Sequence, residues 1–157
     1  MSKIDIVIKY LKSLLGIKFI KTFYPPDPNI DETSYWINTE IPLPTKKTLI
    51  KEGLNCSGMA NLARRKVGLD IPGNIKGKKR YKFIGNTPAW FKYLKDNNRL
   101  EVLDMTKKYP KGSIVIKKYT PKKEGHLGII CDNKMNIIHT HPDPGYMFIE
   151  KLEENMF

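Results

Sequence analysis

Three residues of this sequence have the types and order needed for a nucleophile, its base and a group that orients the base: Cys56, His126 and His139. A cysteine thiolate attacks carbonyl carbon, and an imidazole can remove the thiol proton and later return it to a leaving amine. The cysteine begins a predicted helix, while the histidines lie on two consecutive predicted strands. We therefore predict acyl transfer from a peptide or amide bond through a Cys56 thioester, with His126 as general base and acid.

The third polar group of this set has two candidates on one predicted strand. His139 and His141 fall on the same strand face, and Thr140 falls on the other. Either histidine could orient the imidazole of His126. Strand geometry alone therefore leaves His141 as the alternative third residue.

The helix that must position Cys56 is predicted over residues 55–68. Asn55 can cap its free amides, and Gly68 ends it. Apolar residues recur at helical spacing on one face: Met59, Leu62, Ala63 and Val67. Cys56 then lies at the positive end of the helix dipole, which favours the thiolate and makes the Cys56 backbone amide the natural oxyanion donor. The alternative is that Cys56 is a small buried hydrophobic residue.

Five short strands are predicted after a second helix that begins with Thr87 as cap and Pro88 in its first turn. The strands span residues 100–105, 113–119, 126–131, 135–141 and 146–152. Such short connections force antiparallel pairing. The predicted class is α+β, with helices packed on one face of an antiparallel sheet, in a single domain over residues 1–157.

The N-terminal part is predicted to be an amphipathic helix at residues 2–15 followed by a proline-rich loop at 22–44. We favour packing of this helix on the domain over an interfacial membrane anchor. Charged residues interrupt its apolar face, so it does not read as a secretory signal, and no stretch is long and apolar enough to span a membrane. We accordingly expect a cytoplasmic or virion-associated protein rather than one secreted by the general pathway.

Four short motifs occur in a fixed order between residues 35 and 148. Residues 55–58 read Asn-Cys-Ser-Gly, 112–114 Gly-Ser-Ile, 126–129 His-Leu-Gly-Ile and 138–140 Ile-His-Thr. This order resembles the NlpC/P60 family of papain-like cysteine peptidases. The resemblance implies a papain-like NlpC/P60 fold, thiol protease activity, catalytic Cys56, His126 and His139, and no cofactor. It also implies that Tyr35 lines the site as an oxyanion or substrate residue, although Tyr35 could equally anchor its loop to the core.

Two positions depart from the family pattern. Asn55 and Ser113 stand where the family has aspartates. Neither position is the nucleophile or the base. The departures nevertheless keep open a second hypothesis, a catalytically inactive basic binding or structural protein on the same scaffold.

The net charge of +12 predicts anionic partners. The family commonly cuts peptidoglycan stem peptides, and a cationic enzyme would be attracted to an anionic wall polymer. A basic run with interleaved aromatics at residues 76–83 could also bind single-stranded nucleic acid, although a solvated loop is the more common role of such a run.

A zinc site is the alternative to the thiol mechanism. Residues 139–142 read His-Thr-His-Pro, which resembles the His-x-His-Pro core of the JAMM zinc isopeptidases. That family also needs a serine and an aspartate soon afterwards, and the serine is missing and Asp143 is too close. We therefore expect no metal. Cys131, the second cysteine, is expected to be a reduced packing residue.

Overall fold

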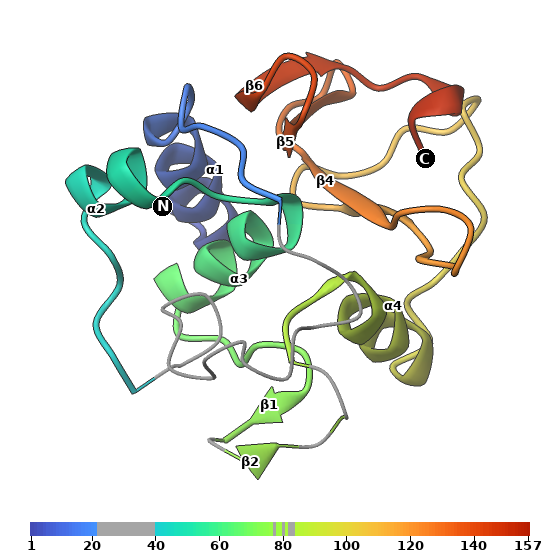
Figure 1. Cartoon of the computed structure of the whole chain (residues 1–157). Helices are drawn as coiled ribbons and strands as arrows, with labels where there is room; N and C mark the ends of the chain where they lie inside the picture. The colour runs from blue at the N-terminus through green and yellow to red at the C-terminus, as the bar shows by residue number, and fades with distance from the viewer. Residues whose placement is uncertain (22–39, 77, 80, 82–83) are drawn as a thin grey trace.

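The computed structural model describes residues 1–21, 40–76, 78–79, 81 and 84–157. Tyr35 and most of the proline-rich loop lie outside the described residues. The elements follow in this order: α1 (Lys3–Ser13), α2 (Lys46–Glu52), α3 (Cys56–Lys66), β1 (Asn74–Ile75), β2 (Lys78–Lys79), α4 (Thr87–Asp96), β3 (Ile114–Lys117), β4 (His126–Ile130), β5 (Asn136–His141), β6 (Tyr146–Lys151) and the 3-10 helix η1 (Glu154–Met156). In Figure 1 the first three helices gather on one side of the molecule and the strands from β4 to β6 on the other.

The main sheet has the strand order β3-β4-β5-β6, and each neighbouring pair is antiparallel. The sequential order follows from the short turns between strands, which leave no length for a crossover. The register sets Lys117 opposite His126 and His139 opposite Phe148. The predicted α+β class with an antiparallel sheet is confirmed.

One face of this sheet packs against α1 and α3 and forms the larger part of the core. The strand residues that point into it alternate along each strand: Leu127 and Ile129 on β4, Ile138 on β5 and Met147 on β6. Because side chains of a strand point alternately to its two faces, His126 and His139 lie on the other face. The second face carries a smaller cluster built on Val115, Ile130, Ile137 and Leu152.

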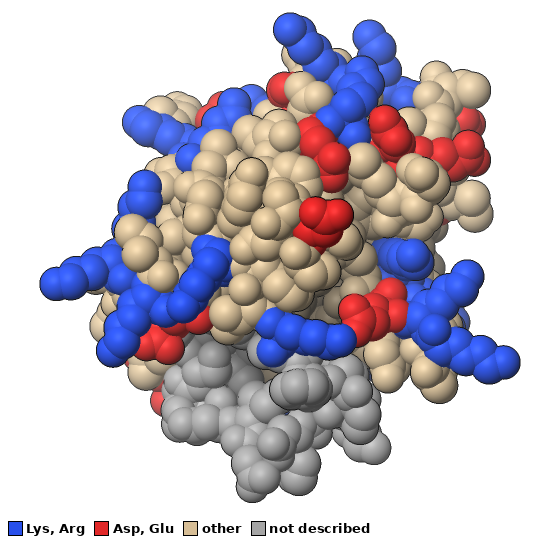
Figure 2. Space-filling view, turned by 45° about the horizontal axis from the view of Figure 1, so that its top comes forward, with Lys and Arg blue, Asp and Glu red and all other residues tan. Residues whose placement is uncertain are grey.

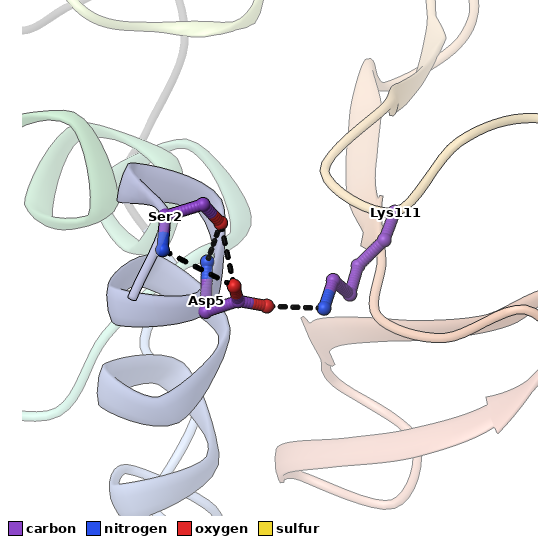
Figure 3. Close-up of polar contacts among 3 residues, drawn as sticks. All are labelled: Ser2, Asp5 and Lys111. Carbon is purple, nitrogen blue, oxygen red and sulfur yellow. Dashed lines mark hydrogen bonds and ion pairs between the residues drawn. The ribbon is translucent and has the colours of Figure 1, made fainter.

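The N-terminal helix is fixed at its start by a capping box, drawn in Figure 3. Ser2 Oγ accepts from the Asp5 backbone amide at 3.2 Å, and the Asp5 carboxylate accepts from the Ser2 backbone amide at 3.3 Å. The carboxylate also accepts from the Ser2 hydroxyl at 2.6 Å. The same carboxylate pairs with Lys111 in the turn before β3. The apolar residues Val7, Ile8 and Leu11 are buried in the core, so this helix packs on the domain.

Two sequence-based predictions were wrong. Residues 100–105 form no strand: Asp104 instead closes a turn by accepting from the Thr106 amide at 2.9 Å, and Val102 is 90 % exposed. The cap of α4 is Asn86, whose side chain accepts from the Ala89 amide, and not Thr87. The prediction overlooked that asparagine caps at least as well as threonine.

None of the described helices has both the length and the apolar character needed to cross a bilayer.

Candidate active site

Cys56 is the first residue of α3, and its neighbours hold the helix start in place. Asn55 Oδ1 accepts from the Gly58 amide at 2.7 Å and from the Ser57 hydroxyl at 3.2 Å. The predicted cap is therefore confirmed, and it works without the charge that an aspartate would bring. Cys56 itself is partly exposed.

A hydrogen-bonded relay runs across three strands on the face opposite α3. His126 Nε2 lies 2.8 Å from His139 Nδ1, and His139 Nε2 lies 2.7 Å from Glu150 Oε1. The three residues come from β4, β5 and β6 in turn. The structure thus brings His139, one of the two candidate third residues, into direct contact with His126.

The carboxylate at the end of the relay determines the tautomer of both rings. Glu150 can only accept, so the proton of neutral His139 must be on Nε2. Nδ1 of His139 is then an acceptor, and His126 must donate to it from Nε2. The lone pair of neutral His126 is therefore on Nδ1, the nitrogen that a general base would use.

Aromatic rings enclose the relay. Phe157 stacks on His126 with ring centroids 5.2 Å apart and planes at 19°, and Phe148 lies 4.6 Å from His139. Only 3 % of His139 is exposed. Burial, assisted by repulsion from His139, His141 and Lys117, lowers the pKa of His126 to about 3. Burial likewise lowers the pKa of His139, although Glu150 opposes the shift.

Burial and nearby polar groups act on the Cys56 thiol in opposite directions. Burial raises its pKa, while hydrogen bonds from the backbones of Leu127 and Ser57 and from the hydroxyl of Thr87 lower it. The helix dipole was expected to favour the thiolate, whereas the loss of solvation around the sulfur favours the neutral thiol. Both shifts, on Cys56 and on His126, favour a neutral thiol and a neutral imidazole at rest.

Cys56 and His126 line one cleft of about 700 Å³. Its walls come from the start of α3, the start of α4 and the 117–126 region of β3 and β4. His141 also lines the cleft, with its ring centroid 5.3 Å from that of His126. Its Nδ1, however, contacts the backbone of Asp143, 2.9 Å from the carbonyl oxygen and 3.2 Å from the amide nitrogen. Of the two candidate third residues, His139 is hydrogen-bonded to His126 and His141 is not.

Two site residues were missed by sequence reasoning. Glu150 could have been found, because a carboxylate two positions after Phe148 falls on the same strand face as His139 once the hairpin register is drawn. Thr87 could not, because it was read as a helix cap. Since Asn86 takes that role, the Thr87 hydroxyl is available to the sulfur, and the residue is only 8 % exposed.

Tyr81 of the basic run does not line this cleft: it packs against α4, where Lys92 Nζ lies 5.1 Å from its ring centroid. Tyr35 lies outside the described residues. Figure 2 shows lysines and arginines projecting from several sides of one face, with acidic residues between them. Within the described ranges, histidine, cysteine, aspartate and glutamate side chains form no group of three that could hold a metal ion.

Searches of protein-family models, of curated proteins and of solved structures find no significant match to this chain.

Proposed function

We propose that this protein is a cysteine hydrolase that cleaves a peptide or amide bond. The observation that carries the proposal is the His126–His139–Glu150 relay, whose first ring lines the same cleft as a cysteine at a helix N-terminus. A thiol, an oriented imidazole and a helix amide are the parts that acyl transfer needs. The order of motifs supports a papain-like fold of the NlpC/P60 type as the finer assignment.

The reaction would begin from neutral groups. His126 removes the thiol proton as Cys56 sulfur bonds to the carbonyl carbon, and the resulting oxyanion accepts a hydrogen bond from the Cys56 amide. The His126 imidazolium then protonates the leaving amine, and the carbon–nitrogen bond breaks to leave a thioester. Water, deprotonated by His126, hydrolyses the thioester and restores the thiol. His139 and Glu150 stabilise the imidazolium in both halves.

Peptidoglycan stem peptides are the substrate that we would test first. The enzyme should lower the turbidity of purified sacculi and release peptides, Cys56→Ala should do neither, and Cys131→Ala should behave as the parent. Released peptides must be identified by mass, because a basic protein can bind an anionic wall without cutting it. Intact sacculi without released peptides would remove the cell-wall assignment and leave other amides open.

An inactive binding protein on the same scaffold is the second candidate. It is favoured by the surroundings of the Cys56 thiol, where burial raises the pKa and the groups that lower it include the backbones of Leu127 and Ser57 and the side chain of Thr87. The two candidates differ in the alkylation of Cys56 by iodoacetamide between pH 5 and 9. If the pair assembles, His126→Ala should slow alkylation at each pH. If alkylation is the same with and without His126, the binding scaffold becomes the better assignment.

A further inference from the structure

The cleft around Cys56 carries more positive than negative charge. Four of its lining residues are lysines: Lys21, Lys117, Lys122 and Lys123. Among the described residues that line it, Glu124 is the one carboxylate, and its Oε1 lies 2.7 Å from Lys21 Nζ. The charges of Lys21 and Glu124 cancel, so the described walls keep a net positive charge from Lys117, Lys122 and Lys123.

The sheet places Lys117 beside His126, and the turn before β4 places Lys122 and Lys123 on the wall of the same cleft. Lys117 ends β3 directly opposite His126, and cross-strand partners of an antiparallel pair point to the same face. It is half-buried, and its charge contributes to the lowered pKa of His126. Lys122 and Lys123 belong to the turn before β4, which is closed by two hydrogen bonds between the backbones of Thr120 and Lys123.

Such an arrangement acts on any charged molecule that approaches the sulfur. A unit cation about 6 Å from a unit anion changes its local concentration roughly threefold even at the dielectric constant of water. Several cations at the mouth of a concave site add to this attraction and raise the association rate of anions. The surface charge of the whole chain is more widely spread, as Figure 2 shows on one face.

We propose that the cleft selects amide substrates that carry an anionic group, a carboxylate or a phosphate, beside the scissile bond, with Lys117 as the main specificity residue. This inference deepens the proposed function and rests on it. The anionic group would lie toward β3 and the 120–123 turn, and the leaving amine would lie on the side of His126 that faces Cys56.

The local potential at Cys56 can be measured without turnover. Iodoacetate and iodoacetamide alkylate the same thiolate, but only iodoacetate is charged, so the ratio of their rates cancels the thiolate fraction. The ratio for Cys56, read by peptide mass at low ionic strength, should exceed the ratio for the neutral thiol N-acetylcysteinamide several-fold. Added salt should reduce the excess, because it screens charges over about 10 Å at 0.1 M.

Lysine variants assign the effect to the cleft. Lys117→Gln should lower the Cys56 ratio about threefold, and the double variant Lys122→Gln/Lys123→Gln should lower it further. The matched control, Lys46→Gln/Lys47→Gln, removes the same charge from exposed positions of α2 and should leave the ratio unchanged. A parent ratio equal to that of the free thiol, or one that falls equally in the control, would overturn the proposal. A Cys56 that neither reagent reaches would also overturn it, since an open cleft must admit molecules this small.

Cleavage rates of charged and neutral amides test the selection for anions separately from the hydrolase activity. Matched amides with succinyl, phosphoryl and acetyl groups should be cleaved in a ratio that favours the two anions, and the two anionic arms tell carboxylate from phosphate. Equal cleavage of all three would overturn the selection while leaving the hydrolase intact. Cleavage of none, in these amides or in peptides, would refute the hydrolase.

Discussion

The two faces of the main sheet are used for different purposes. Toward α1 and α3 the strands present Leu127, Ile129 and Ile138, which are almost completely buried. Toward the other side the same strands present His126, His139 and Glu150, which are linked by hydrogen bonds. One face therefore supplies hydrophobic stabilisation, and the other supplies polar groups in defined protonation states.

This difference explains how a small domain can keep a buried polar relay. Burying an imidazole lowers its affinity for protons and costs free energy unless its nitrogens are paired. The apolar face, with the two helices packed on it, provides the compensating stability. The strand alternation lets both functions coexist on neighbouring residues such as His126 and Leu127.

The largest effect is expected on the helix side. Leu127→Ala removes a side chain with 0 % exposure and should lower the free energy of unfolding by about 2–5 kcal/mol. Urea unfolding followed by circular dichroism measures this loss, and Val102→Ala, at a 90 % exposed position, is the control. Activity per folded molecule should remain near the parent value. A loss below about 1 kcal/mol would mean that the core does not depend on this face.

A change in the His126–His139–Glu150 relay should lower activity and leave stability nearly unchanged. Glu150→Gln can place an amide donor against His139 and reverse the tautomers of both rings, and kcat/KM should fall roughly 10- to 100-fold. The urea midpoint should change little by comparison. Glu153→Gln, an exposed neighbour, serves as the matched control. Unchanged kcat/KM in Glu150→Gln would separate the carboxylate from the chemistry.

Low pH should lower the stability of the fold through protonation of His126. The pKa of His126 falls from 6.5 to about 3 on folding, so between these values the unfolded chain binds more protons than the folded one. The contribution of neutral His126 to stability is therefore complete above pH 6.5 and is lost as the pH falls toward 3, at most by about 1.4 kcal/mol per pH unit. Urea midpoints from pH 3.5 to 7 should fall less steeply in His126→Asn. Parallel curves would contradict the burial of a neutral ring.

The smallest effect on the site is expected from a change at Thr87, whose hydroxyl influences the Cys56 thiol. Thr87→Val removes the hydroxyl that reaches the Cys56 sulfur and should slow iodoacetamide alkylation at neutral pH by about two- to tenfold, the range for one neutral hydrogen bond. Thr87→Ser should retain the parent rate. If Val and Ser variants are equally slow, the packing of the threonine methyl group and not its hydroxyl supports the thiol.

Local patterns in the sequence predicted most of this framework. The spacing of apolar residues gave the helix at Cys56, and the turn signals gave the last four strands close to their observed bounds. The strand at residues 100–105 failed because β-type composition does not reveal whether a segment has a pairing partner. The position of Cys56 at the start of a helix could not reveal that burial would raise its pKa, since desolvation depends on tertiary packing. The choice between His139 and His141 likewise required the side-chain geometry, which places His139 Nδ1 2.8 Å from His126 Nε2.

The hairpin of β5 and β6 has a consequence for how the protein folds. His139 and Glu150 belong to this one hairpin, whereas Cys56 lies far earlier in the sequence. Local hairpins close much faster than long-range contacts, because less chain entropy is lost. We therefore expect the orienting half of the site to assemble first, and the thiol to reach its position only when α3 docks.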